Sequence, residues 1–362
     1  MRLLPVANPP NPWASTEVDY LDLPDPEDPT RSLAPHQRLT VYEDHTRNIL
    51  STNDSPDLPF TWSINPYRGC FHACAYCYAR PTHEYLSFGA GTDFDRKIVV
   101  KPEAAKLLRA ALEKRSWKGE VIVFSGVTDC YQPLEAGYRL TRQCLEVCRD
   151  YKQPAGIITK SPLVERDIDV LSELARVTQV HVTVSIPFWD EDKARAIEPY
   201  VATPARRLRT VERLAQAGIE VGVNVAPIIP GLNDEDIPTL LEAARAAGAS
   251  HACITLLRLP GPVAEVFEER LRAALPLRAD KVMRRIRETR GGKVNDARFG
   301  VRGRGEGVYA EAIQGLFEAT AKRLGLLPSW IQPVSGESVE KPVEKQASFE
   351  RPDRSGQMKL FT

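Results

Sequence analysis

Short apolar runs alternate with amphipathic segments through the middle of the chain, and this pattern is the strongest constraint on the fold. Each run has the length and the branched, apolar composition of a buried strand. The runs are TWSINPY (61–67), VIVFSG (121–126), AGIITK (155–160), VHVTVSI (180–186), IEVGVNVAPII (219–229) and HACITLLRL (251–259). One strand–helix unit roughly every 25 to 40 residues predicts a parallel sheet with right-handed crossovers.

Six such units are too few for a complete eightfold barrel. We therefore expect an α/β protein built on a partial (β/α)6 TIM-like barrel. The expected parts are a proline-rich, extended and partly disordered N-terminal extension (1–58), the barrel (59–260), a helical C-terminal region interrupted by a basic, glycine-rich loop (261–330) and a disordered tail (331–362).

Composition narrows the class of protein. The 362 residues have a formal net charge of zero, so no global field attracts a polyanion. No apolar run approaches the roughly 20 residues of a membrane helix, and the proline-broken start does not resemble a signal peptide. Seven cysteines at low density do not form a secreted disulfide framework. These features predict a cytoplasmic protein whose clustered thiols have metal or redox chemistry.

The segment NPYRGCFHACAYCYAR (65–80) follows the first predicted strand, at the carboxyl edge where α/β proteins gather their functional groups. Cys70, Cys74 and Cys77 have the spacing C-x3-C-x2-C. Three thiolates in one loop can hold three irons of a [4Fe–4S] cluster and leave the fourth iron open. A zinc site completed by His72 or His83, and three unrelated core thiols, are the alternatives.

The sequence resembles the radical S-adenosylmethionine (radical SAM) superfamily. The resemblance rests on the cysteine motif together with the segments TDCYQPLE (128–135) and APIIPGLND (226–234). The branch that they resemble contains spore photoproduct lyase and DNA-repair-photolyase-like proteins. The likeness covers about residues 60–260 and continues more weakly to about 325. It implies that SAM binds the open iron, that a flavodoxin- or ferredoxin-like donor supplies an electron, and that a 5′-deoxyadenosyl radical forms.

The resemblance also implies SAM-binding residues. They are Tyr76 near the adenine, one of Ser125, Thr128 and Asp129 at the methionyl amino group, Lys160 at the carboxylate, the Ser185 hydroxyl, and Asn224 pointing into the barrel. Ordinary structural roles remain the alternatives: loop packing, a turn, a solvated lysine and a core amide.

The hydrogen-donor residue is less clear. Spore photoproduct lyase uses a cysteine near its second strand, and Gly126 stands at that place here, which leaves the thymine-dimer reaction itself in question. Cys130, Tyr131 and Glu135 are the candidates for a catalytic role. Cys144 and Cys148, with Cys130 and Cys253, have the residue types for an auxiliary cluster, although buried free thiols are commoner.

Residues 281–304 contain nine Lys or Arg against Glu288 and Asp296, a local balance of +7. This segment is the best candidate for phosphate contacts with DNA or RNA, the alternative being a solvated helix face followed by a packed loop. Near the end of the chain, Gln357, Leu360 and Phe361 form Q-x-x-L-F, which is similar to peptides that dock bacterial repair proteins on the sliding clamp. Matches this short also arise by chance.

These observations favour a radical SAM enzyme that performs a lyase- or repair-type reaction on a nucleic acid. Radical modification of a protein or an RNA is the second enzymatic hypothesis. A non-enzymatic hypothesis is an iron–sulfur redox sensor in a nucleic-acid-binding module.

Overall fold

The computed structural model describes residues 39–328 and 348–352. Its main feature is an eight-stranded sheet in the order β11-β10-β9-β8-β7-β6-β3-β2. The strands are β2 (Leu50–Thr52), β3 (Trp62–Ile64), β6 (Ile122–Phe124), β7 (Ala155–Thr159), β8 (Val180–Ser185), β9 (Glu220–Ile228), β10 (His251–Leu256) and β11 (Leu327–Pro328). All neighbours from β3 to β11 are parallel, and β2 is antiparallel to β3. The six predicted strands and the α/β barrel architecture are confirmed.

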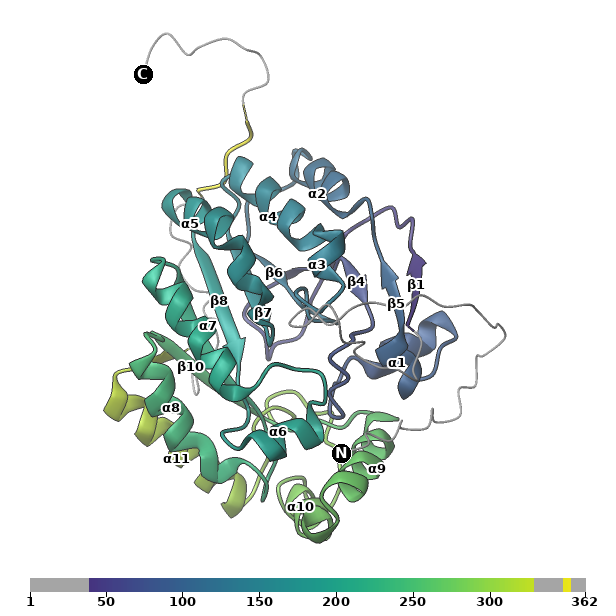
Figure 1. Cartoon of the computed structure of the whole chain (residues 1–362), viewed down its shortest axis with the longest axis vertical. Helices are drawn as coiled ribbons and strands as arrows, with labels where there is room; N and C mark the ends of the chain where they lie inside the picture. The colour runs from purple at the N-terminus through teal and green to yellow at the C-terminus, as the bar shows by residue number, and fades with distance from the viewer. Residues whose placement is uncertain (1–38, 329–347, 353–362) are drawn as a thin grey trace, which may run out of the picture.

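Helices connect these strands and cover the sheet (Figure 1). They are α1 (Thr92–Arg96), α2 (Ala104–Leu112), α3 (Glu135–Tyr138), α4 (Leu140–Asp150), α5 (Ile168–Val177), α6 (Glu191–Ile197), α7 (Pro204–Gln216), α8 (Ile237–Ala246), α9 (Val263–Ala274), α10 (Pro276–Glu288) and α11 (Val308–Leu324), with 3-10 turns at Arg80–Leu86, Pro162–Asp167 and Asp234–Asp236. Of the helices in the described ranges, none is long and apolar enough to span a membrane.

Local sequence explains where α7 begins and ends. Thr203 accepts a hydrogen bond from the Arg206 amide, and Pro204 occupies the first turn, where its missing N–H costs nothing. Gly218 follows the helix with a φ of 75°, a conformation that glycine adopts without steric cost. The strand β9 can therefore begin two residues later.

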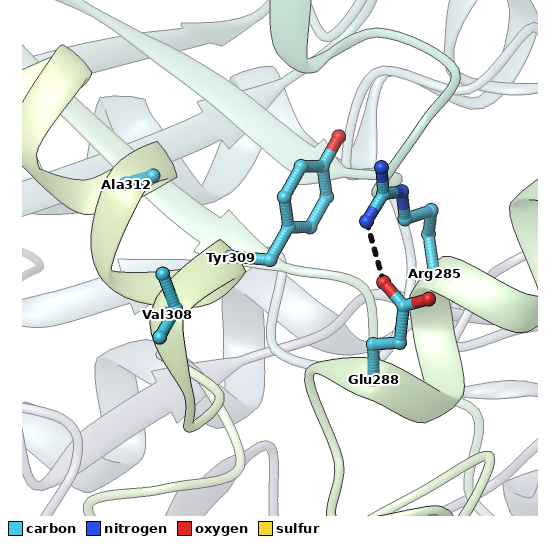
Figure 2. A pocket seen from close by; sticks show the side chains of 5 residues that line it. All are labelled: Arg285, Glu288, Val308, Tyr309 and Ala312. Atoms are coloured by element: carbon cyan, nitrogen blue, oxygen red, sulfur yellow. Dashed lines mark hydrogen bonds and ion pairs between the residues drawn. The ribbon is translucent and has the colours of Figure 1, made fainter.

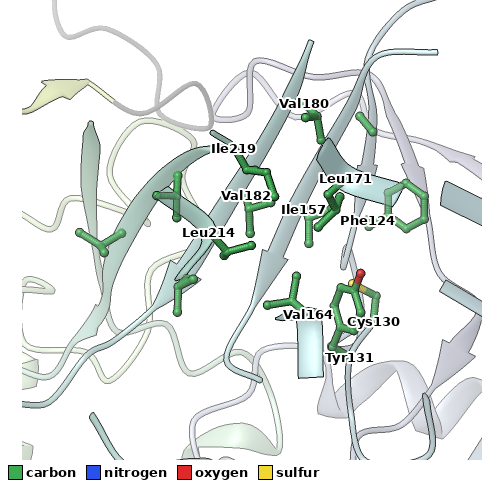
Figure 3. Close-up of a cluster of buried hydrophobic side chains, with 14 of the residues drawn as sticks. Phe124, Cys130, Tyr131, Ile157, Val164, Leu171, Val180, Val182, Leu214 and Ile219 are labelled. Atoms are coloured by element: carbon green, nitrogen blue, oxygen red, sulfur yellow. The ribbon is translucent and has the colours of Figure 1, made fainter. Parts of the chain in front are cut away.

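Alternation along the strands separates two environments. One face of β6 to β10 packs against the helices in a continuous core that includes Val182, Leu171 and Leu214 (Figure 3). The opposite face of the same strands presents Ser185, Asn224 and other polar side chains to the barrel interior, because successive residues point to opposite sides. An apolar outer layer and a polar interior are the physical basis for a ligand site inside the barrel.

A second sheet, in the order β1-β5-β4, was not predicted. It contains β1 (Thr40–Glu43), β4 (Tyr67–Arg68) and β5 (Lys97–Val100), and β1 pairs in parallel with β5 from Thr40↔Lys97 onward. Two strands therefore lie within residues 39–58 of the expected extended arm, because β1 and β2 obtain their backbone hydrogen bonds from the more distant strands β5 and β3.

Part of the tail also departs from the prediction of disorder. The Glu350 amide donates to the Tyr151 carbonyl at 2.9 Å, and the rings of Phe349 and Tyr151 stack with centroids 6.4 Å apart. Arg351 donates to the carbonyls of Leu112 and Lys114. Residues 348–352 thus dock where α2 and α4 lead into strands. Gln357, Leu360 and Phe361 lie outside the described residues.

Candidate active site

The loop after β3 that contains the three motif cysteines is held by backbone bonds and one buried arginine. The Cys70 amide donates to the Phe94 carbonyl at 3.0 Å, and the Cys77 amide donates to the Cys74 carbonyl at 3.2 Å. Arg80, which is 1% exposed, donates to the Cys74 carbonyl through Nε and a terminal nitrogen, at 3.1 and 2.9 Å. The guanidinium therefore fixes the middle of the loop.

The three thiols lie within electrostatic reach of one another. Burial raises the pKa of Cys77 to about 11, and the neighbouring Cys70 adds to this rise. Burial and the Glu198 carboxylate raise the pKa of Cys74 well above its ordinary value. Three neighbouring thiolates, two of them buried and one partly buried, would repel each other strongly unless a cationic group lay between them. The residues therefore fit an iron–sulfur cluster, which requires thiolates and supplies positive charge.

The zinc alternative gains no support. His83 directs Nε2 to the Lys97 carbonyl at 2.8 Å and packs edge-on against Phe94. His72 has its Nδ1 3.4 Å from the Asp129 carboxylate and also lies beside the Cys70 thiol, and these two neighbours outweigh burial and raise its pKa, so that its ring carries a proton. Across the described part of the chain, no three His, Cys, Asp or Glu side chains are arranged to hold a single metal ion.

Lys160, at the end of β7, lies beside the cysteine loop. Its ammonium is 5.6 Å from the centre of the Tyr76 ring. Burial alone lowers the pKa of Lys160, but Cys74 and Glu198 outweigh burial and raise it. The site therefore holds a permanent cation next to the thiols, as an anionic ligand group would need.

Polar residues form a row across the neighbouring strands. Ser185 of β8 is in register with Asn224 of β9, which is in register with Cys253 of β10. The Cys253 thiol donates to Asn224 Oδ1 at 3.2 Å. The predicted residues Ser185 and Asn224 thus lie at one level of the barrel interior with Cys253, and Lys160 directly follows Thr159, which is in register with Val184.

Two of the three residues proposed for the methionyl amino group, Thr128 and Asp129, already form hydrogen bonds within the protein. Thr128 donates to the Gly69 carbonyl at 2.6 Å. Asp129 accepts from Thr159 Oγ1, from the Lys160 amide and from the Tyr131 amide, and its pKa is about 2, because these bonds and His72 outweigh burial. These contacts connect Thr128 to the cysteine loop and Asp129 to the end of β7.

Ser125, the third of these residues, is bonded within the protein as well. Its backbone has a φ of 87°, a conformation that side-chain-bearing residues adopt at a cost. Its Oγ accepts from the Cys130 amide at 2.9 Å. The assignment of the methionyl amino group among the three residues therefore stays a prediction.

Sequence reasoning missed a buried chain of contacts behind the site. Tyr76 donates its hydroxyl to Glu198, which pairs with Arg207 at 2.6 Å, and Arg207 also donates to the Ser185 carbonyl at 2.8 Å. Arg207 occupies a position of α7 that shares its face with Val211 and Leu214. An arginine on the apolar stripe of a helix was the signal that could have revealed it.

The three catalytic candidates lie in the protein interior, fully buried. Cys130 belongs to the core between sheet and helices, where burial raises the pKa of its thiol well above the ordinary value. Tyr131 donates to Asp167 at 3.1 Å, and Glu135 accepts from Tyr67, from the Thr141 amide and from Arg166. Their burial and these contacts argue against direct contact with a substrate.

The expected auxiliary cluster is not supported either. Cys144 and Cys148 lie with Cys130 in the same outer core, whereas Cys253 faces the barrel interior. Because the sheet separates these positions, the four thiols do not share one site.

Much of the basic segment already has intramolecular partners. Arg290 is 1% exposed and donates to the Leu257 carbonyl, while Arg298 pairs with Asp296 and Glu306. The local charge available to a polyanion is therefore smaller than the sequence balance of +7 suggests.

Arg285 borders an open surface pocket of about 360 Å³ between α10 and α11 (Figure 2). It pairs with Glu288 at 2.6 Å and lies over the Tyr309 ring at 4.3 Å. Val308 and Ala312 complete the pocket, which includes none of the predicted site residues.

Comparison with known proteins agrees with the fold and the cysteine loop. Residues 64–244, half of the chain, match the family model of the radical SAM superfamily. The chain belongs to this superfamily, whose cofactors are a [4Fe–4S] cluster and SAM.

Similar sequences occur in bacteria and archaea. An uncharacterized protein of Mycobacterium tuberculosis is 40% identical over 206 residues, which cover 56% of this chain and 61% of that protein. An uncharacterized protein of Methanocaldococcus jannaschii is 32% identical over 171 residues, which cover 47% and 61%. The chain thus spans less than two thirds of the length of these relatives.

Among solved structures, spore photoproduct lyase complexed with dinucleoside spore photoproduct has a similar fold. The TM-score is 0.57 with 16% sequence identity, over 79% of each chain. At this identity the likeness describes the fold alone.

Proposed function

We propose that this protein is a radical SAM enzyme that performs a lyase- or repair-type reaction on a nucleic acid. The observation on which the proposal rests is the position of the three-thiol loop. It lies at the carboxyl end of the first barrel strand, beside Lys160, and the row containing Ser185 and Asn224 continues from there into the barrel.

Cys70, Cys74 and Cys77 hold the cluster in this proposal, and Lys160 pairs with the carboxylate of SAM. Tyr76 packs against the adenine, with its hydroxyl oriented by Glu198. When bound, the two cofactors supply a carbon-centred radical that removes a hydrogen atom from the substrate. The apolar outer core keeps the strand ends rigid, so that the polar interior meets the substrate in one geometry.

The substrate class is argued from two features. The fold is shared with a lyase whose structure contains a dinucleoside photoproduct. The mouth of the barrel also has arginines and exposed aromatic side chains, Arg258 and Tyr78 among them, which suit phosphates and bases. An external low-potential electron donor is a further requirement of the proposal.

The test is SAM cleavage by anaerobically reconstituted protein reduced with dithionite. We expect wild-type protein to bind about four irons per chain and to release 5′-deoxyadenosine. Cys74→Ser should lose both properties. Cys148→Ser, which changes a thiol in the outer core, is the matched control and should retain both.

A protein that binds the cluster but forms no 5′-deoxyadenosine would be a sensor, and the enzymatic proposal would be wrong. The substrate class is tested by adding spore-photoproduct dinucleoside, DNA oligonucleotides and RNA oligonucleotides in separate reactions. A nucleic-acid substrate should accelerate SAM cleavage, and deuterium placed on that substrate should appear in 5′-deoxyadenosine. Acceleration by a protein extract depleted of nucleic acid, with none by the oligonucleotides, would contradict this part.

A further inference from the structure

A clasp of four residues joins the two ends of the main sheet. Arg302 donates to the carboxylate of Asp57 and to the hydroxyl of Ser55, and the Gly300 amide donates to Asp57 at 2.7 Å. Ser55 and Asp57 lie between β2 and β3, at one edge of the sheet. The loop containing Gly300 and Arg302 runs along β10 near the other edge, where the Leu256 amide donates to the Gly303 carbonyl at 2.8 Å.

The clasp therefore crosses the side of the barrel that the strands leave open. The sheet begins at β2 and ends at β11, and these two strands do not pair with each other. The contact between residues 57 and 302 spans 245 positions of sequence. A ligand that enters the barrel from this side has to pass the clasp or displace it.

A second arginine lies beside the clasp, close enough for the Asp57 carboxylate to attract it without forming an ion pair. Arg258 follows β10, and in the described ranges no hydrogen bond or ion pair involves its guanidinium. The guanidinium lies 5.9 Å from the centre of the Tyr78 ring. Burial, followed by the nearby charge of Arg302, lowers the pKa of Arg258, which places the two cations close together.

Each of these arginines is paired with an exposed aromatic ring. Tyr78 is 52% exposed, and its hydroxyl donates to the Gly126 carbonyl at 2.8 Å, at the end of β6. Phe299 is 57% exposed and lies 4.3 Å from the guanidinium of Arg302. Tyr78 directly follows Cys77, so this surface continues into the cysteine loop.

We propose that Arg258 and Arg302 form a binding site for the phosphodiester backbone of a single-stranded nucleic acid, and that Asp57 occupies this site until the strand displaces it. The inference rests on the proposed function, which it deepens by assigning the entry site of the substrate. A phosphate offers the guanidinium of Arg302 the same paired acceptor oxygens as the Asp57 carboxylate. The exposed rings of Tyr78 and Phe299 provide surfaces on which unpaired bases stack.

The positions of the clasp and of Arg258 have a common electrostatic explanation. Arg258 and Arg302 repel each other, and the single carboxylate of Asp57 near them compensates only one of the two positive charges. An incoming strand supplies several phosphates, so it pairs with both arginines and releases Asp57. The side chains of Arg302 and Asp57 already reach solvent, at 15% and 22% exposed, so a strand can approach the pair without unfolding the barrel.

The experiment is fluorescence anisotropy with a labelled 12-nucleotide single-stranded DNA, and with RNA of the same sequence, using full-length protein with its cluster at several salt concentrations. Asp57→Asn should bind about twofold to fivefold more tightly than wild type, because the competing carboxylate is gone. Arg302→Gln and Arg258→Gln should each bind more weakly. Each should also reduce the slope of log affinity against log salt by about 0.7, the value for one lost phosphate contact. The comparison of DNA with RNA identifies which strand is preferred.

The pair Arg323–Glu242 provides matched controls, because it is an exposed ion pair between α11 and α8. Glu242→Gln and Arg323→Gln make the same charge changes and should leave affinity and salt slope unchanged. If Asp57→Asn binds no more tightly than Glu242→Gln, or if Arg258→Gln has the affinity of wild type, the inference is wrong. Arg258→Gln keeps the test valid if the clasp variants unfold, because Arg258 has no hydrogen bond or ion pair in the described structure to lose.

The two proposals fail separately. If the clasp variants change the oligonucleotide affinity but the protein does not cleave SAM, the binding site is supported and the enzymatic function is refuted. If the protein cleaves SAM but its oligonucleotide affinity is the same in the Asp57, Arg258 and Arg302 variants, the enzymatic function is supported and the entry site is refuted.

Discussion

Replacing Glu198 with alanine is expected to destabilise the protein by about 3–5 kcal/mol, the usual cost of removing one partner of a buried ion pair. Glu198 and Arg207 both have fully buried side chains, so the variant leaves the Arg207 guanidinium uncompensated in the interior. An unfolding entropy of about 2.1 cal/mol/K per residue, over roughly 300 described residues, gives about 0.6 kcal/mol/K. The midpoint of thermal unfolding should therefore fall by about 5–8 °C.

The assay is anaerobic calorimetry or circular dichroism of cluster-loaded wild-type and variant proteins. Glu242→Ala removes the acid of an exposed pair and should cost about 1 kcal/mol or less, which makes it the control. A melting temperature for Glu198→Ala within about 1 °C of that control would refute the reasoning.

A double variant separates stability from function. Glu198→Leu with Arg207→Met replaces the charged pair by apolar groups, which is often neutral or stabilising. We expect the melting temperature to recover. The affinity for SAM should stay low, because the Tyr76 hydroxyl has then lost the carboxylate that orients it.

Three further predictions concern separate parts of the molecule. Lys160→Gln should weaken SAM binding about 10- to 100-fold in equilibrium dialysis, since a charged hydrogen bond is worth about 1.5–3 kcal/mol, whereas Lys152→Gln at the opposite end of β7 should not. Burial lowers the pKa of His83 from 6.5 to about 4, so the unfolded chain binds the extra proton first and stability falls as pH drops from 6.5 to 4. Urea unfolding should show about 3 kcal/mol of this loss, and His83→Gln should remove it; equal pH dependence in both proteins would contradict the assignment. Phe349→Ala should cost about 1–2 kcal/mol and expose Tyr151, which faster proteolysis near residue 348 would report.

The barrel strands were predictable because each is a buried apolar run whose signal is local. In β8, Val182 and Val184 face the core, and Thr183 and Ser185 face the interior, so composition and alternation are both visible in the sequence. The cysteine loop was predictable for the same reason, since all of its thiols lie within eight residues.

Elements that depend on distant partners were not predictable in this way. The strands β1 and β2 are only four and three residues long. Their hydrogen bonds come from pairing with β5 and β3, which the local sequence does not predict. Cys130 follows β6 in sequence, but its side chain packs into the outer core, and this outcome depends on the helices that cover it.

Charged groups were the hardest to interpret from the sequence. Arg302 looks like part of a basic surface when read beside its neighbours, yet its partners Ser55 and Asp57 come from the other end of the chain. Arg290 is buried rather than exposed, and its guanidinium donates hydrogen bonds to backbone carbonyl groups. A charge count along the sequence cannot distinguish these cases, because the compensating groups are brought in by folding.

The docking of residues 348–352 places this described segment at one end of the barrel. This segment contacts the turns that lead from α2 into β6 and from α4 into β7, which lie at the amino ends of the strands (Figure 1). The cysteine loop lies at the carboxyl ends. A label or surface linker attached at Pro352 would therefore hold the domain by the end of the barrel opposite the cysteine loop.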